Sequence, residues 1–268
     1  MTASPLINVM SAAAVKAGKG LMRDFSEVDQ LQISKKGTAN FVTQSDIRTE
    51  KLLQRELAKA RPDFGFLLEE GGEVSGKDSD YRWIIDPLDG TTNFIHAIPY
   101  FCISIALEKR SVGKSEIVAG VIFDPVHNEL FSAEKGKGGT VNGRKLYVSN
   151  REQMEDAMIV TSNPRLSYQA DTRSSALFDN IAKSGATIRF FGATALDLAN
   201  IAAGRIDAGW YYTIQPWDIA AGMLLIAEAG GQITDFSGKP VNAYSKPVLA
   251  SNSQLLMPMQ RLLSQAAA

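Results

Sequence analysis

Apolar positions near the start of the chain follow a helical spacing, and those further along alternate in short runs. Apolar residues recur every three or four positions from Leu6 to Ala13, which predicts a helix over residues 5–24. A second helix is predicted over residues 45–60, after a polar segment at 34–43. Glycine-containing turns then separate short β-rich runs. The strands predicted from these runs cover residues 64–68, 81–85, 101–108, 117–123 and 129–133. This meander predicts an antiparallel sheet backed by two helices.

The second half of the chain changes to an alternation of strand-like and helical runs. The predicted strands cover residues 157–161, 187–191, 206–212, 232–235 and 247–250. The predicted helices cover residues 174–184, 195–203 and 217–229, and a last one begins at 253. Alternation of this kind is typical of an α/β layer. With a boundary near 142–150, we expect an N-terminal α+β half over 1–145 and a C-terminal α/β half over 146–268.

Composition and charge narrow the class of protein. The 28 Lys and Arg residues nearly balance the 29 Asp and Glu residues, so direct nucleic-acid binding through a basic surface is disfavoured. The apolar runs are too short to span a membrane, and no basic residue precedes the apolar N-terminal stretch, so no signal peptide is predicted. Cys102 is the single cysteine and cannot form an intrachain disulfide. It is predicted to be a buried strand residue in a protein of the reducing cytoplasm.

The densest chemical signal is the segment 86–92, with the sequence Asp-Pro-Leu-Asp-Gly-Thr-Thr. An apolar strand leads into two acids three residues apart, Asp86 and Asp89. Gly90 permits a tight bend, and Thr91 can begin a helix whose free amides face an anion. Carboxylates beside a phosphate cradle suit Mg²⁺, which binds a few carboxylates together with water and substrate phosphate. An ordinary Asp-Gly turn with a helix cap explains this segment equally well when it is taken alone.

Three further acid-bearing turns lie at the ends of predicted elements. The pair Glu69 and Glu70 ends a strand, and its simpler explanation is a solvated strand end. Asp218 begins an apolar helix and Asp46 begins another, and helix capping accounts for each separately. Four such turns in one chain are harder to explain by capping alone.

Taken in their order, these segments closely resemble the inositol monophosphatase family. The resemblance is carried by Glu69-Glu70, the segment 86–92, Trp217-Asp218, residues 41–43 ahead of Asp46, and Gly-Ala-Thr-Ala at 192–195. It extends from about Ala13 to Leu263. The segments 86–94 and 124–131 are similar to the bacterial branch of the family that includes the suppressor protein SuhB. The resemblance implies an α+β fold, a layered α-β-α-β-α sandwich of the inositol monophosphatase and fructose bisphosphatase type, in a homodimer.

The resemblance also implies a metal site at matching positions. Glu69, Asp86 and the carbonyl of Leu88 would hold the first Mg²⁺. Asp86, Asp89 and Asp218 would hold a second, and Glu69 would help to hold a weaker third. The family further implies inhibition by lithium, which replaces a loosely held Mg²⁺.

Catalytic and substrate positions follow from the same resemblance. Thr91 and Asp46, with Glu69, would orient and deprotonate the attacking water. The amides of Gly90 and Thr91 would receive phosphate oxygens. The positions expected to contact the substrate are Asp89, Gly90, Thr91, Gly192, Thr194, Tyr211 and Asp218. The water would attack the phosphate in line, because no cysteine or serine lies in a nucleophile setting and His96 and His127 are isolated.

The chain departs from the family at two positions. Asn40 stands where the family commonly has Asp, next to the metal site. Tyr211 stands seven residues before the metal-binding Asp218, where the inositol enzymes carry a Glu that holds substrate hydroxyls. A phenol is a weaker and neutral partner compared with a carboxylate. Because strand alternation allows a register error of one residue, Tyr211 could instead point into the core and leave the contact to Tyr212 or Thr213.

Three functions are therefore open on the sequence. The favoured one is an Mg²⁺-dependent, inositol-1-phosphatase-like hydrolase acting on a small phosphorylated polyol or sugar. A related phosphatase could act on histidinol phosphate, fructose bisphosphate or a 3′-phosphoadenosine nucleotide. The third is a SuhB-like binding partner of the transcription or ribosome-assembly machinery.

Overall fold

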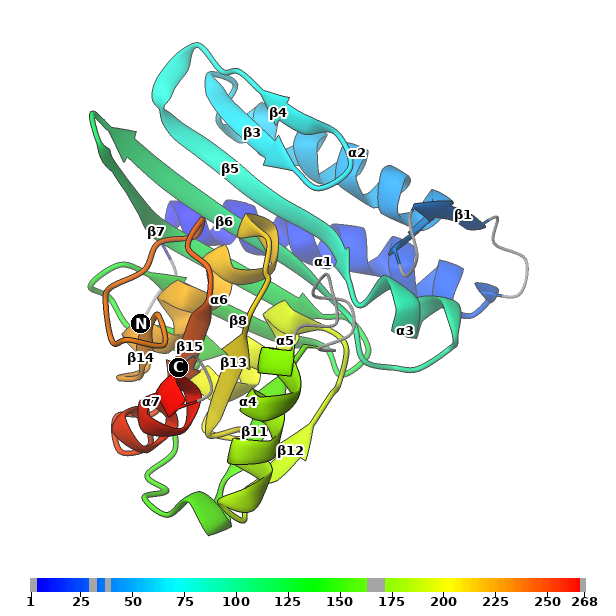
Figure 1. Ribbon diagram of the computed structural model, residues 1–268. Helices are drawn as coiled ribbons and strands as arrows, with labels where there is room; N and C mark the ends of the chain where they lie inside the picture. The colour runs from blue at the N-terminus through cyan, green and yellow to red at the C-terminus, as the bar shows by residue number, and fades with distance from the viewer. Residues whose placement is uncertain (1–3, 29–32, 37–39, 163–171, 266–268) are drawn as a thin grey trace.

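The structure is a computed structural model, and it describes residues 4–28, 33–36, 40–162 and 172–265. Two β-sheets and three groups of helices form successive layers (Figure 1). α1 and α2 pack on one face of the large sheet, and α5 and α6 lie between the large sheet and the small one. α4 and α7 cover the far face of the small sheet. This order confirms the predicted α-β-α-β-α sandwich.

The large sheet has eight strands in the order β10-β9-β8-β7-β6-β5-β3-β4. Its strands are β3 (Phe64–Leu68), β4 (Gly72–Val74), β5 (Asp78–Asp89), β6 (Cys102–Ser111), β7 (Lys114–Asp124), β8 (Glu129–Glu134), β9 (Gly139–Val141) and β10 (Arg144–Lys145). The prediction of a purely antiparallel sheet is wrong at one pair, because β3 runs parallel to β5. The short strand β4 turns back along the outer edge of β3, and the segment after β4 returns the chain to the other side of β3.

The small sheet has five strands in the order β12-β11-β13-β15-β14. They are β11 (Met158–Thr161), β12 (Thr187–Arg189), β13 (Ala208–Tyr211), β14 (Gln232–Thr234) and β15 (Val248–Ser251). β11 runs parallel to both neighbours, and β15 runs antiparallel to β13 and β14. The second half is therefore a mixed sheet with alternating helices, as its pattern predicts.

The helices begin close to the residues expected from their capping signals. Their bounds are α1 (Pro5–Phe25), α2 (Gln44–Ala60), α3 (Thr91–Ile95), α4 (Thr172–Lys183), α5 (Thr194–Ala202), α6 (Pro216–Glu228) and α7 (Leu256–Gln265). At the start of α1, the amide of Ile7 donates to the Ser4 hydroxyl at 3.2 Å, and Pro5 occupies the first turn. The short helix α3 follows Gly90, whose φ of 96° lies in the left-handed region that favours glycine.

The sequence pattern also missed the short strands β4, β9 and β10 and two further features. The polar segment before α2 contains a two-stranded hairpin, β1 (Ile33–Lys36) and β2 (Asn40–Thr43). β5 also does not end at Ile85 but continues to Asp89. Among the described residues, no helix is long and apolar enough to cross a membrane.

Candidate active site

Two acids lie at the end of β5, and a bulge in the strand accounts for their closeness. In a regular strand, residues three apart point to opposite faces. Here Asp86 pairs with Ser104 but Asp89 pairs with Cys102, so the strand carries one extra residue between them. A bulge of this kind re-aims side chains. Asp86 and Asp89 consequently lie close enough for the charge of Asp89 to raise the pKa of Asp86.

Glu69 reaches the same place because β3 is parallel to β5. Leu68 pairs with Ile85, and the Glu69 amide donates to the Ile85 carbonyl at 3.3 Å. Glu69 is therefore the neighbour of Asp86, and the two carboxyls share a hydrogen bond. Burial raises the pKa of both groups well above the usual range, and the charge of each neighbouring acid adds to the effect.

Asp89 lies at the N-terminus of α5. The amide of Ala195 donates to Asp89 Oδ2 at 2.6 Å, and the Thr194 and Leu196 amides also bond this carboxylate. Burial and the charge of Asp218 together raise the pKa of Asp89 to about 7, against the lowering effect of the three amides. The sequence predicted the acid but not the helix N-terminus that holds it.

Asp218 lies in the first turn of α6. It occupies the third helical position rather than the cap, because Gln215 is the capping residue. The Gln215 amide donates to Asp218 Oδ2 at 2.9 Å, which completes a capping box. Burial raises the pKa of Asp218 to about 6, against the effects of the Gln215 amide and of Lys246. Asp218 is therefore both a member of the capping box and a buried acid of the candidate site.

The remaining expected catalytic residues lie on neighbouring elements. Asp46 is buried in the first turn of α2, and its charge contributes to the raised pKa of Glu69, which places the two acids near each other. The Thr91 hydroxyl donates to the Leu88 carbonyl at 3.0 Å, so these two expected site residues are in direct contact. The Leu88 amide in turn donates to Asp86 Oδ1 at 2.9 Å.

The expected substrate positions divide into two kinds. Gly192 is exposed, with a φ of 84°, and Thr194 is the first residue of α5, so both border the acid cluster through Asp89. Tyr211 is 0% exposed and packs in the central core between the two sheets. Its hydroxyl has no hydrogen-bond partner among the described residues, and the charges of Asp197 and Asp89 reach it. That Tyr211 contacts the substrate stays a prediction. Tyr212 is exposed, with its ring near Phe236.

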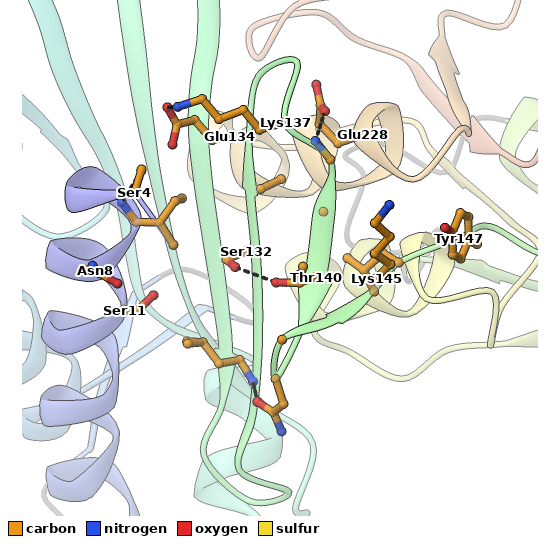
Figure 2. A pocket seen from close by; sticks show the side chains of 18 residues that line it. Ser4, Asn8, Ser11, Ser132, Glu134, Lys137, Thr140, Lys145, Tyr147 and Glu228 are labelled. Carbon is orange, nitrogen blue, oxygen red and sulfur yellow. Dashed lines mark hydrogen bonds and ion pairs between the residues drawn. The ribbon is translucent and has the colours of Figure 1, made fainter. Parts of the chain in front are cut away.

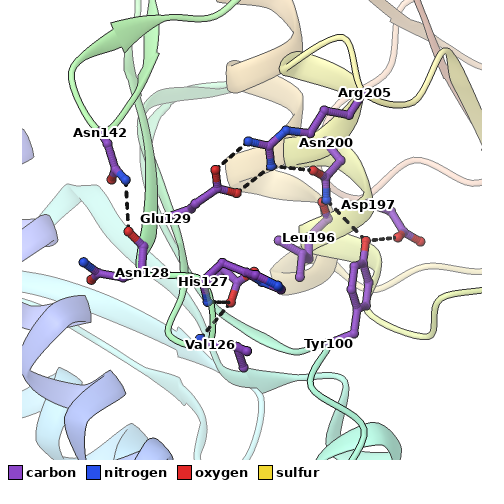
Figure 3. Close-up of polar contacts among 11 residues, drawn as sticks. Tyr100, Val126, His127, Asn128, Glu129, Asn142, Leu196, Asp197, Asn200 and Arg205 are labelled. Atoms are coloured by element: carbon purple, nitrogen blue, oxygen red, sulfur yellow. Dashed lines mark hydrogen bonds and ion pairs between the residues drawn. The ribbon is translucent and has the colours of Figure 1, made fainter.

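A buried polar network beside the acids was not predicted from the sequence. The Tyr100 hydroxyl donates to Asp197 Oδ1 at 2.6 Å, within an apolar stretch of α5 (Figure 3). Asn200 contacts the same hydroxyl at 3.4 Å, and Arg205 forms an ion pair with Glu129 of β8. Two polar residues, Asp197 and Asn200, inside the otherwise apolar run at 195–202 were the available sequence signal. This network fixes α5, and α5 in turn holds Asp89.

Cys102 is fully buried in β6, as predicted, with Sγ 3.8 Å from Asp89 Oδ2. Burial raises the pKa of its thiol well above the usual range, so the thiol stays protonated beside the acids. Cys102 is therefore an uncharged side chain that borders the acid cluster.

A separate cavity of about 570 Å³ lies where the start of α1 faces the edge strands of the large sheet (Figure 2). The first turns of α1 border it with Ser4, Asn8 and Ser11, and β8 and β9 face them. The facing hydroxyls of Ser132 and Thr140 lie 3.2 Å apart. No acid of the cluster lines this cavity, so it is not the catalytic site.

The acid cluster has the chemistry of an Mg²⁺ site. Its potential ligands are mostly hard carboxylate oxygens. Burial together with mutual repulsion raises the pKa of four of the five acids, namely Glu69, Asp86, Asp89 and Asp218. A bound divalent cation would reverse these pKa shifts. In the described part of the chain, no three acidic, cysteine or histidine side chains already have the mutual spacing of a closed metal cage. The acids nevertheless act on one another, because the charge of Asp218 raises the pKa of Glu69 and of Asp86, and the charge of Asp89 also raises that of Asp86. Mg²⁺ keeps several waters and suits such an open arrangement.

Comparisons with known proteins support the same chemistry. Residues 2–267 match the inositol monophosphatase family. The inositol-1-monophosphatase of Rhizobium meliloti is 45% identical over 267 residues, which cover 99% of this chain and 98% of the relative. The Nus factor SuhB of Pseudomonas aeruginosa is 40% identical over 93% of this chain and 92% of the relative. The crystal structure of the extragenic suppressor protein SuhB from Bartonella henselae has a TM-score of 0.93 at 46% identity, covering 98% of this chain and 99% of that one.

Proposed function

Since the chain belongs to the inositol monophosphatase family and is a phosphatase of that family, we propose that it hydrolyses inositol-1-phosphate or a closely related phosphorylated polyol with Mg²⁺. The observation that carries the proposal is the meeting of five acids from four separate elements, namely Asp46 of α2, Glu69 after β3, Asp86 and Asp89 of β5, and Asp218 of α6. The curated relatives named inositol-1-monophosphatase, at 45% identity, support the choice of substrate.

Glu69, Asp86 and the Leu88 carbonyl hold one Mg²⁺ in this proposal, and Asp86, Asp89 and Asp218 hold another. Bound Mg²⁺ lowers the pKa of a water, polarises the phosphoryl oxygens and neutralises the leaving alkoxide. The residues of the chain provide position and proton transfer. The Thr91 hydroxyl is fixed by its bond to the Leu88 carbonyl, so one of its lone pairs is directed away from the main chain.

Proton transfer falls to Thr91 and Asp46 in this proposal, with Glu69 in support. The water's proton would go to Thr91 Oγ1 while the hydroxyl's own proton, which in this structure is donated to the Leu88 carbonyl, would turn toward Asp46 and be accepted there. The amides of Gly90 and Thr91 bind phosphate oxygens at the start of α3, where the first amides have no acceptor inside the helix. Catalysis is then positioning plus charge stabilisation, as in phosphoryl transfer generally.

A substrate panel with purified protein tests this function. We expect Mg²⁺-dependent release of phosphate from inositol-1-phosphate, inhibition by Li⁺, and loss of turnover in excess chelator. Histidinol phosphate, fructose bisphosphate and 3′-phosphoadenosine nucleotide complete the panel. A higher kcat/KM for one of these compounds would identify it as the preferred substrate in place of inositol-1-phosphate, with the same type of phosphatase activity. Full turnover in chelator would refute the metal mechanism.

Tyr211 provides a prediction about specificity. If its hydroxyl reaches the polyol subsite, Tyr211→Glu restores a charged acceptor and lowers KM for inositol-1-phosphate by about 10-fold, the effect of 1–3 kcal/mol for a hydrogen bond to a charged group. The kcat should change little, because such a contact is equal in the ground and transition states. Tyr212→Glu is the matched control on the exposed neighbour. An unchanged KM in Tyr211→Glu, with the fold intact, would show that Tyr211 only fills the core.

A second candidate function is favoured by the relatives named Nus factor SuhB, which are 37–40% identical. We infer from them a possible protein-binding role beside catalysis, in the cytoplasm and as a homodimer. The buried free Cys102 supports a reducing compartment, and the exposed Ile98 and Phe190 support an interface. Affinity capture with a catalytically inactive variant, combined with sedimentation analysis, tests this role. Retention of a transcription partner by the inactive variant would separate binding from hydrolysis.

A further inference from the structure

The two sides of the active site are built from different segments of the chain. The phosphate side consists of Asp89, Gly90 and Thr91, at the end of β5. The polyol side consists of Gly192 and Thr194, at the start of α5. A substrate that bridges the two sides requires a fixed distance between them. A side chain that bonds to both segments would set that distance.

Asn93 joins the two segments directly. It lies in α3, two residues after Thr91, and is buried at 8% exposure. Its Nδ2 donates to the Tyr100 carbonyl at 2.8 Å and to the Phe191 carbonyl at 2.7 Å. Both N–H groups of the amide are therefore used, and both acceptors are main-chain atoms. Phe191 immediately precedes Gly192.

Close packing supports the same junction. A Cβ at Gly192 would lie 3.2 Å from Asn93 Nδ2, and one at Gly90 would lie 2.9 Å from the Tyr100 carbonyl and 3.1 Å from the Ala193 Cβ. Both glycines have positive φ, so the two segments touch through backbone that other residues would not allow. The rings of Tyr100 and Phe191 also pack, with centroids 5.0 Å apart.

These contacts complete a closed ring of hydrogen bonds and chain. From Asp89 the ring follows the chain to Asn93, crosses to the Phe191 carbonyl, follows the chain to Ala195, and returns through the Ala195 amide to Asp89. We propose that Asn93 is a positioning residue that sets the distance between the phosphate side and the polyol side. The inference rests on the proposed function, because it assumes a polyol phosphate as substrate.

Loss of Asn93 should affect the two sides unequally. The Ala195 amide still bonds Asp89 when the Asn93 amide is removed, so the phosphate side keeps its shape. The Phe191 carbonyl loses its donor, and Gly192 moves with it. Substrate binding should weaken on the polyol side, whereas inorganic phosphate, which needs only the phosphate side, should bind as before.

Two variants test this. Asn93→Asp keeps the shape but removes both donors, and Asn93→Ala removes them without adding charge. For both we expect KM for inositol-1-phosphate, or for the best polyol phosphate of the panel, to rise about 10-fold or more. The competitive Ki of inorganic phosphate should change by less than about twofold. Inorganic phosphate contacts only the phosphate side, which is the same in the variants and in the wild type.

Asn252→Asp is the matched control. Asn252 is also buried, and its Nδ2 also donates twice, to Ser149 Oγ and the Arg151 carbonyl, away from the acids. The Asn252→Asp variant should have a lower thermal midpoint, but the ratio of its KM for the polyol phosphate to its Ki for inorganic phosphate should be unchanged. Parallel rises of KM and Ki in both Asn93 variants, or an unchanged KM, would overturn the positioning role. A wild-type protein inactive on every polyol phosphate would instead overturn the proposed function, and this inference with it.

Discussion

Replacing Asp89 by asparagine is expected to abolish Mg²⁺-dependent turnover while leaving the fold intact. The amide oxygen of asparagine can still accept the Ala195 amide, which now donates to Asp89 Oδ2 at 2.6 Å. The N-terminus of α5 therefore keeps its partner, and packing changes little. What is lost is one negative charge from the pair Asp89 and Asp218, and with it affinity for the ion.

Removing an outer partner of a metal ligand typically costs up to about 100-fold. The expected loss in kcat/KM exceeds this value, because the proposed function makes Asp89 itself a metal ligand. The circular dichroism spectrum should resemble that of the wild type, which would show that the fold is intact. Asp63→Asn, at an exposed acid beside Lys77, is the control and should be fully active. Normal turnover in Asp89→Asn at saturating Mg²⁺ would remove Asp89 from the metal site.

Much of the fold and of the acid set could be predicted from the sequence because both depend on local signals. The periodicity of α1 and the apolar runs of β6 and β7 determine those elements directly. The four acid-bearing turns lie at the ends of strands or helices that the apolar pattern predicts. The position of the acids in one cluster could not be derived from the same signals, and it entered through the family resemblance.

The features that were missed depend on contacts distant in the sequence. The parallel pairing of β3 with β5 is such a contact, and it brings Glu69 to Asp86. The two acceptors of Asn93 lie seven and 98 residues away, so its sequence neighbourhood gave no indication of its role. The full burial of Tyr211 likewise depends on α5 and on Gly209, where a Cβ would lie 2.9 Å from the Tyr211 hydroxyl.

The acid cluster should also make the stability of the metal-free protein depend on pH in an unusual direction. Burial raises the pKa of Asp89 from 3.8 to about 7 and that of Asp218 from 3.8 to about 6. A raised pKa means that the folded state binds protons more tightly than the unfolded state does. The resulting stability is complete below about pH 4 and is lost as the pH rises toward 7.

In chelator, we therefore expect the cluster's contribution to the free energy of unfolding to fall between about pH 4 and 7, by up to about 1.4 kcal/mol per pH unit for each titrating group. Mg²⁺ binds the deprotonated carboxylates, so its stabilising effect should be larger at pH 8 than at pH 5. Asp89→Asn removes one titrating group and one repelling charge. In chelator at pH 8 the variant should consequently be more stable than the wild type, and its stability should vary less with pH. Urea unfolding at pH 5, 6, 7 and 8, with chelator or with Mg²⁺, measures both effects. Parallel pH profiles for variant and wild type in chelator would show that Asp89 does not titrate in this range.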